Sequence, residues 1–212
     1  MPSVSDCLPS GRNGSSVIIG VDEAGRGPLA GPVVAAAVVL GAEVPAGLGD
    51  SKTITAKRRG ALEGAIKQHC LWSVGVVEAD EIDRLNILGA TMLAMTLAVA
   101  ALSELLQNTP IEMVLIDGNM TPAARRPEWR WPARAIVRGD ASEPCISAAS
   151  IIAKEHRDRL MRAAAAVHPH YGWERNAGYG TAEHLAALRK HGATPLHRRS
   201  FAPVAAVFRA GD

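Results

Sequence analysis

The chain has 212 residues, of which 48% are hydrophobic, enough for one packed domain. Its eight aromatic residues (four Trp, two Tyr, two Phe) are too few for the stacking platforms of single-strand nucleic-acid binders. The net charge of +2 is unevenly distributed: residues 1–119 hold 8 Lys and Arg against 13 Asp and Glu, and residues 120–212 hold 15 against 8. A metal-binding acidic half and a polyanion-binding basic half would produce this distribution, but so would solvated basic helices.

The cysteines and the hydropathy bear on where the protein works. Three widely spaced cysteines (Cys7, Cys70, Cys145) fit a reducing cytoplasm and neither a zinc site nor a disulfide framework. The most apolar stretch, 33–40, is far shorter than the ~20 residues of a membrane-spanning helix. Residues 1–15 are polar and lack a hydrophobic signal core. We therefore expect a cytoplasmic protein with no membrane segment and a disordered N-terminal lead-in.

Residues 16–212 are expected to form one α/β domain. In chain order, the hydrophobic patterns predict a strand at 16–21, a strand at 33–40, a helix at 55–68, a strand at 71–77, helices at 79–85 and 88–106, strands at 113–116 and 133–137, and helices at 147–167 and 181–190. Pro28 and Pro32 exclude a helix between the first two strands, which favours an antiparallel pair. The tail from Pro195 has no clear period. This order predicts a mixed sheet flanked by helices, with a helical C-terminal region.

Three of the predicted strands end in carboxylates. Asp22 and Glu23 follow the first strand, Asp117 follows the fourth, and Asp140 lies just after the fifth. If these strands are neighbours, the four side chains converge at one edge of the sheet. Adjacent buried acids repel each other and lose hydration, so a cation must compensate them. Four carboxylates suit Mg²⁺ or Mn²⁺, and two such ions could hold the attacking water and the leaving oxygen of a phosphodiester.

Each acid taken singly has a plainer explanation. Asp117 alone is typical of a turn former or a helix cap, and Asp140 alone of a cap for the helix that follows. Asp22 and Glu23 are harder to explain in this way, because a glycine-rich turn follows them directly after an apolar strand. That turn lacks the spacing of a dinucleotide loop, and the chain has neither a P-loop nor a serine-hydrolase elbow.

Together these residues resemble a known family. The stretch 22–32, DEAGRGPLAGP, is similar to the signature of type 2 ribonucleases H, specifically bacterial ribonuclease HII. Similar segments follow in the family's order: Asp50-Ser51-Lys52, Leu85-Asn86-Ile87-Leu88, Asp117-Gly118-Asn119, Gly139-Asp140 with 146–154, Arg157-Asp158 and Gly178-Tyr179-Gly180-Thr181. The resemblance runs from about Val17 to Phe201. The large extra N-terminal domain of type HIII enzymes is missing, which favours type HII.

The resemblance implies an RNase H-like fold with a helical C-terminal region. It also implies endonucleolytic hydrolysis of the RNA strand of RNA–DNA hybrids, including single ribonucleotides embedded in duplex DNA. Cleavage on the 5′ side of the ribonucleotide would leave a 3′-hydroxyl and a 5′-phosphate. By the same resemblance, Asp22, Glu23, Asp117 and Asp140 are the catalytic ligands of Mn²⁺ or Mg²⁺, with a two-metal site expected.

The resemblance assigns substrate contacts as well. Gly25, Arg26 and Gly27 would read the ribose 2′-hydroxyl and its phosphate, and Tyr179 would stack at the junction between ribonucleotide and DNA. Only the 2′-hydroxyl distinguishes RNA from DNA at a given site, and glycine backbone can approach it closely. Without the family, Tyr179 also fits the edge of a core. The further implied contacts are Lys52, Lys154 and Arg138, the last at a position where the family more often has Lys.

Several other residues are expected to have plainer roles. His168, His170 and His184 lack a completing metal ligand at a suitable spacing, so we expect them to be solvated or to face nucleic acid. His156 stands where the family commonly has a small or hydroxyl residue, and we expect it to be solvated. The Trp-Arg-Trp sequence at 129–131 is expected to pack on the sheet rather than to contact nucleic acid.

We expect a monomer that acts on RNA–DNA hybrids and ribonucleotide-containing duplex DNA. A contact with a replication clamp has little support, because the tail 203–209 carries a single aromatic residue. One alternative is another RNase H-fold nuclease that cuts DNA. A second is a non-enzymatic nucleic-acid-binding protein, which would show salt-sensitive binding without metal-dependent cleavage.

Overall fold

The computed structural model describes residues 16–48 and 54–209, and within them it contains a five-stranded mixed sheet of order β3-β2-β1-β4-β5. The strands are β1 (Val17–Ala24), β2 (Val33–Val39), β3 (Leu71–Val77), β4 (Ile111–Asp117) and β5 (Ala133–Ile136). β1 pairs antiparallel with β2, and β2 with β3, whereas β1–β4 and β4–β5 are parallel pairs. The predicted mixed sheet and its antiparallel first pair are confirmed.

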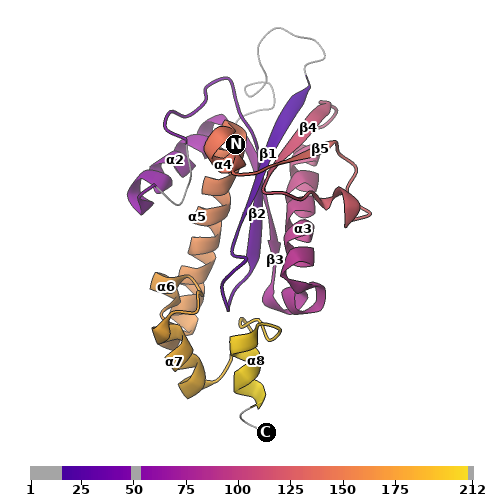
Figure 1. The fold of residues 1–212 in the computed structure, drawn as a ribbon. Helices are drawn as coiled ribbons and strands as arrows, with labels where there is room; N and C mark the ends of the chain where they lie inside the picture. Colours follow the sequence, from indigo (N-terminus) through magenta and orange to yellow (C-terminus); the bar gives the residue numbers. More distant parts are fainter. Residues whose placement is uncertain (1–15, 49–53, 210–212) are drawn as a thin grey trace.

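Helices cover both faces of the sheet (Figure 1). α3 (Ala79–Leu105) lies on one face, and α2 (Ala56–His69) and α5 (Pro144–Val167) lie on the other. The shorter helices are α4 (Gly139–Ser142), α6 (Trp173–Asn176), α7 (Ala182–His191) and α8 (Ala202–Arg209), with 3₁₀ turns η1 (Pro122–Ala124) and η2 (Pro169–Tyr171). α6, α7 and α8 gather beyond the far end of α5 (Figure 1), which is the predicted helical C-terminal region.

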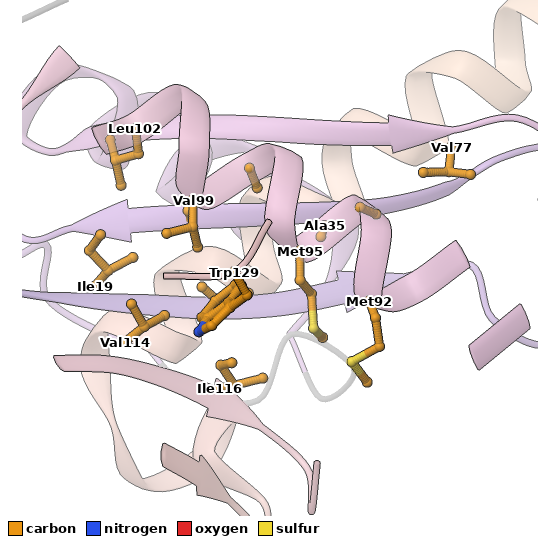
Figure 2. Packing of buried hydrophobic residues seen from close by; sticks show 14 of the residues in the cluster. Ile19, Ala35, Val77, Met92, Met95, Val99, Leu102, Val114, Ile116 and Trp129 are labelled. Atoms are coloured by element: carbon orange, nitrogen blue, oxygen red, sulfur yellow. The ribbon is translucent and has the colours of Figure 1, made fainter. Parts of the chain in front are cut away.

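The larger hydrophobic core lies between α3 and the sheet. Ile19 and Val114 from the strands meet Val99 and Leu102 from α3 (Figure 2). Trp129 belongs to the same cluster and is 8% exposed, with its indole N–H donating to the Trp131 carbonyl at 2.7 Å. The prediction that the Trp-Arg-Trp loop packs on the sheet is therefore confirmed for Trp129.

On the opposite face, β1 comes very close to the start of α5. A Cβ added to Gly20 would lie 2.2 Å from the carbonyl carbon of Cys145. Successive side chains of a strand point to opposite faces, so Asp22 shares the α5 face with Gly20. The close approach of α5 to β1 therefore covers the strand just before its carboxylate.

The two predicted helices 79–85 and 88–106 are confirmed: both lie in α3, separated at Asn86, whose φ of 58° and ψ of 167° are not helical. Three predictions need correction. Asp22 and Glu23 lie within β1, which continues to Ala24, rather than after the strand. Asp140 lies in the first turn of α4 rather than at a strand end, because β5 stops at Ile136. The tail, which shows no period in the sequence, contains α8.

By length and composition alone, α3 is a helix that could span a membrane, unlike the shorter stretch 33–40. Half of its most apolar window is buried in the protein, where it packs against β2 and β3. Its apolar side chains thus build the core of this fold.

Candidate active site

Two aspartates lie side by side near the ends of β1 and β4: Asp22 comes two residues before the end of β1, and Asp117 is the last residue of β4. The parallel register pairs Val21 with Ile116, so the next residues, Asp22 and Asp117, are neighbours at one edge of the sheet. Because side chains alternate along a strand, both aspartates point to the face covered by α5. Ser150 on α5 forms a hydrogen bond with the Asp22 carboxylate.

Glu23 and Asp140 extend this acidic group. The backbone N–H of Glu23 donates to Oδ1 of Asp22 at 2.7 Å, and that of Asp140 donates to Oδ1 of Asp117 at 3.3 Å. Asp140 is 7% exposed and lies in the first turn of α4. Asp22 is thus close to Glu23 and Asp117, and Asp140 adjoins Asp117 through its backbone N–H, so that one of the four predicted acids comes from a helix.

The Asp22 carboxylate occupies an electrostatically unfavourable position. The residue is 6% exposed. Burial raises the pKa of Asp22 well above its ordinary value, and the negative charges of Glu23 and Asp117 raise it further, against the lowering effect of the Ser150 hydrogen bond. A bound cation would remove this penalty by compensating the clustered charges.

The donor set fits an open divalent-metal site. Mg²⁺ and Mn²⁺ prefer carboxylate oxygens, and Mg²⁺ usually keeps several waters or substrate phosphates in its coordination shell. Within residues 16–48 and 54–209, no group of three or more Asp, Glu, His or Cys side chains is arranged to hold a metal ion by itself. An ion at these carboxylates would therefore share its coordination with water or a phosphate.

A cleft of about 310 Å³ opens beside Asp22. Its wall combines acids, cations and glycines from the end of β1 and the loop after it, from α5, and from the segment before α7. The lining residues are Asp22, Glu23, Ala24, Gly25, Arg26, Gly27, Ser150, Lys154, Arg157 and Tyr179. The mixture of carboxylates and cations suits a phosphodiester held next to a metal ion.

Two glycines let the loop after β1 come close to its neighbours. Gly25 has a φ of +98°, and a Cβ there would lie 2.1 Å from Nε of Arg157. A Cβ on Gly27 would touch the Tyr179 ring at 3.4 Å. Tyr179 is 48% exposed, so its ring forms an accessible wall of the cleft beside the glycine backbone.

The predicted cationic contacts have different placements. Lys154 lines the cleft, with Nζ 2.8 Å from the Asp158 carboxylate. Arg26 also lines it, and Nη1 lies 3.3 Å from Oε1 of Glu23. Arg138 is exposed in a left-handed conformation before α4 and is not among the lining residues.

The histidines are less exposed than predicted. His184 is 0% exposed, because the inner face of α7 buries its ring against Trp173 and His197. His156 is half-buried, and burial followed by the nearby positive charges lowers its pKa. Of the others, His170 is exposed and stacks on the ring of His191.

Some residues of the site were not predicted to have a role. Ser150 and Arg157 fall in segments that resemble the family, yet the sequence indicates neither the Asp22 contact nor the place in the cleft wall. Arg198 does not line the cleft, but its guanidinium donates to the carbonyl oxygen of Gly25 at 2.6 Å. It gives no signal in the sequence, because the backbone that it contacts is distant along the chain. Lys52 lies outside the described residues.

Fold and site together define a class of protein. A mixed sheet with carboxylates at the adjoining ends of two parallel strands, beside a glycine-rich loop and an exposed ring, is the arrangement of a ribonuclease H-like nuclease. The family model described as Ribonuclease HII matches residues 19–204. The chain belongs to the ribonuclease HII family, and it is an endoribonuclease of the ribonuclease H type, which acts on RNA–DNA hybrids.

Curated relatives are similar to this chain in sequence, and solved structures are similar to it in fold. Ribonuclease HII of Novosphingobium aromaticivorans is 76% identical over 190 residues, covering 89% of this chain and 97% of that protein. Ribonuclease HII of Erythrobacter litoralis is 62% identical over 200 residues, covering 94% of each. The crystal structure of ribonuclease H2 from Pyrococcus horikoshii OT3 matches with a TM-score of 0.70 at 23% identity, over 92% of this chain and 98% of that chain. Bst-RNase HIII in complex with Mn²⁺ matches with a TM-score of 0.75 at 20% identity, over 94% and 71%. These two structures bear on the fold alone.

Proposed function

We propose that this chain is a divalent-metal-dependent endonuclease that cuts on the 5′ side of single ribonucleotides embedded in duplex DNA, and within the RNA strand of hybrids. Its products would carry a 3′-hydroxyl and a 5′-phosphate. The observation that supports this most is the buried Asp22 carboxylate beside Asp117, at the mouth of a cleft that also holds Gly25, Gly27 and Tyr179.

Asp22, Glu23, Asp117 and Asp140 would hold Mg²⁺ or Mn²⁺. When bound, such ions supply an activated water and stabilise the charge that develops on the phosphodiester. The chain's own residues orient the substrate. Arg26 and Lys154 offer positive charge to the phosphates that flank the scissile bond. The exposed backbone of Gly27 is accessible to a 2′-hydroxyl, and Gly25, although buried, lines the same cleft.

The ring of Tyr179 stands beside that glycine backbone, where it can stack on the sugar or base at the junction between ribonucleotide and DNA. The carboxylates, the loop and the ring all come from one chain, so we also propose that the protein acts as a monomer. Its elution in size-exclusion chromatography tests this.

Cleavage of two labelled duplexes tests the proposed activity. The duplexes share one sequence, and one of them carries a single ribonucleotide. We expect cuts in the ribonucleotide duplex only, with Mg²⁺ or Mn²⁺ and not with EDTA. Asp22→Asn should slow cleavage by roughly a hundredfold or more, the loss typical of removing a group that stabilises transition-state charge.

Asp80→Asn is the matched control, since Asp80 is an exposed acid in the first turn of α3, and its cleavage rate should equal that of the unmodified chain. Near-normal cleavage by Asp22→Asn would contradict the role of Asp22. Cleavage of both duplexes would favour the DNA-cutting alternative, and salt-sensitive binding without cleavage would favour the non-enzymatic one.

A further inference from the structure

The segment that carries the proposed ribose-reading residues belongs to no helix or strand. From residue 25 to residue 32 the backbone is irregular apart from one isolated bridge, between Ala30 and His197. Gly25 and Gly31 adopt φ angles of +98° and +83°. Such a segment has no hydrogen-bond ladder of its own to hold its shape. Groups packed behind it must therefore hold it.

A buried arginine lies behind this segment. Arg198, in the chain after α7, is 0% exposed. Its guanidinium donates hydrogen bonds to five carbonyl oxygens: those of Gly25 at 2.6 Å, Arg26 at 3.0 Å, Pro28 at 2.8 Å, Gly31 at 3.0 Å and Pro32 at 3.2 Å. One bond from Nε, two from Nη1 and two from Nη2 match the five N–H donors that a guanidinium has.

A second buried arginine joins this segment to the tyrosine of the cleft. Arg157, on α5, is 1% exposed. It donates to the carbonyl oxygens of Pro32 at 2.9 Å, Ala30 at 3.0 Å and Ala177 at 2.8 Å. Ala177 lies two residues before Tyr179, so one guanidinium connects the two walls of the cleft.

The two arginines also set the charge behind the segment. In the described part of the chain neither forms an ion pair with a carboxylate. Burial lowers the pKa of Arg198 to about 9 and that of Arg157 to about 10, so both remain charged at neutral pH. A buried charge needs compensation, and here the carbonyl dipoles of the segment supply it. Those carbonyls are consequently engaged by cations rather than presented to an anionic substrate.

We propose that Arg198 is a positioning residue that holds Gly25, Arg26 and Gly27 in the conformation that distinguishes a ribonucleotide from a deoxyribonucleotide. The inference rests on the proposed function. Arg198 does not line the cleft and acts only through the backbone that it holds, while Arg157 extends the same support to Tyr179. Arg198, in the chain after α7, thereby contributes to selectivity without touching the substrate.

Arg198→Lys tests the inference. Lysine keeps the charge but replaces a planar group of five donors by one ammonium with three, so it cannot hold five carbonyls. Binding of the full chain is measured in EDTA with the all-DNA and single-ribonucleotide duplexes. We expect the ratio of the two affinities to fall roughly tenfold, the effect of losing one or two hydrogen bonds of a charged group. Affinity for the all-DNA duplex, which depends on phosphate contacts, should change by less than about twofold.

Leu102→Ala is the matched control for stability. Leu102 is buried in the core between α3 and the sheet, so its truncation should lower the Tm and leave the affinity ratio unchanged. Should Arg198→Lys fail to fold, Arg157→Lys undergoes the same test, because it gives up three contacts of the same support.

The possible results distinguish a failure of the Arg198 inference from a failure of the proposed nuclease function. A folded Arg198→Lys that cleaves and keeps the unmodified affinity ratio would overturn this inference alone. An unmodified chain that cleaves at the ribonucleotide but binds both duplexes equally in EDTA would also contradict it. An unmodified chain that cleaves neither duplex with Mg²⁺ or Mn²⁺ would refute the proposed function instead.

Discussion

At the scale of single residues, the buried Asp22 carboxylate, which we propose binds metal, lowers the stability of the metal-free fold. Its pKa is raised by burial and by Glu23 and Asp117. A carboxyl whose folded pKa exceeds its unfolded value binds its proton more tightly in the folded state. Stability is therefore lost as the pH rises from the unfolded value near 4 through the folded value. At neutral pH the metal-free protein carries this penalty at its active site.

Removing the charge should therefore stabilise the metal-free protein. Asp22→Asn keeps an oxygen that can accept the Glu23 N–H but has no negative charge. At neutral pH in EDTA we expect its Tm to rise by roughly 2–4 °C, the shift that about 1 kcal/mol produces in a domain of this size. Differential scanning calorimetry measures it. Asp80→Asn is the control for loss of an exposed acid, and because Asp80 lies in the first turn of α3 its removal should lower the Tm slightly or leave it unchanged, never raise it. A lower Tm for Asp22→Asn would show that its anion is compensated within the chain.

At the scale of elements, glycine controls how closely α3 approaches the sheet. A Cβ on Gly75 of β3 would lie 2.1 Å from the carbonyl oxygen of Ala94 and 2.8 Å from the amide nitrogen of Ala98. Both atoms are helix backbone, which cannot rotate away as a side chain can. Residue 75 therefore has to be glycine for α3 to pack at this distance.

Gly75→Ala should destabilise the protein, while a matched change on α2 should not. We expect the free energy of unfolding of Gly75→Ala to fall by about 1–3 kcal/mol or more through overpacking. Gly64 on α2 has no atom within 4 Å of an added Cβ, so Gly64→Ala should add roughly 0.5–1 kcal/mol through helix propensity. Urea unfolding of both variants checks this, and equal effects would contradict the packing argument.

The same scale explains why the sequence predicted two helices within the range of α3. Asn86 interrupts α3, and its Oδ1 accepts from the backbone N–H groups of Leu88 and Gly89 at 3.0 and 3.1 Å. This is N-cap chemistry at the start of the second helix, and it is the physical cause of the break predicted after residue 85.

At the scale of the whole molecule, a chain of hydrogen bonds ties the C-terminal region together. The Thr194 N–H donates to Nδ1 of His197, and Trp173 donates to Nε2 of His184. His197 therefore carries its proton on Nε2, which lies 3.0 Å from Nε2 of His184, and His184 uses Nδ1 to donate to the Tyr179 carbonyl at 2.9 Å. Both rings must be neutral for this pattern to hold.

Mild acid should weaken this region. Burial, followed by the charges of His184 and His168, lowers the pKa of His197 to about 4 from 6.5. Between pH 6.5 and 4 the unfolded chain binds a proton at His197 that the folded chain does not bind. The contribution of neutral His197 to the free energy of unfolding is therefore fully present above pH 6.5 and is lost as the pH falls. The full shift corresponds to about 3 kcal/mol.

Urea unfolding at pH 7.5, 6.5 and 5.5 measures this loss. His197→Asn should be less stable than the unmodified chain at pH 7.5 and should show a flatter pH dependence. His170→Gln, at an exposed position where the ring stacks on His191, should change the profile less than His197→Asn does. An unmodified chain whose stability does not change between pH 7.5 and 5.5 would contradict the neutral pair.

The parts of the site that could be predicted depend on neighbouring residues, whereas the parts that could not be predicted depend on tertiary contacts or on very short elements. Asp22 and Asp117 could be found because strand ends are local features of the hydrophobic pattern. Asp140 was located, but on the wrong element, because a short turn such as α4 buries too little apolar surface to leave a period. His184 was misjudged as solvated, since the ring that buries it belongs to a distant segment.

What the sequence determined by itself is the set of local features: the strands and longer helices, the acids near the ends of two strands, and the glycine-rich loop whose resemblance to one family is specific. Each depends on residues a few positions apart. Only the tertiary structure decided what lies behind that loop, because Arg198 meets the carbonyls of Gly25 and Arg26 across more than 170 residues of chain. A hydrogen bond to backbone leaves no mark on the identity of the accepting residue, and no pattern in the sequence could have shown it.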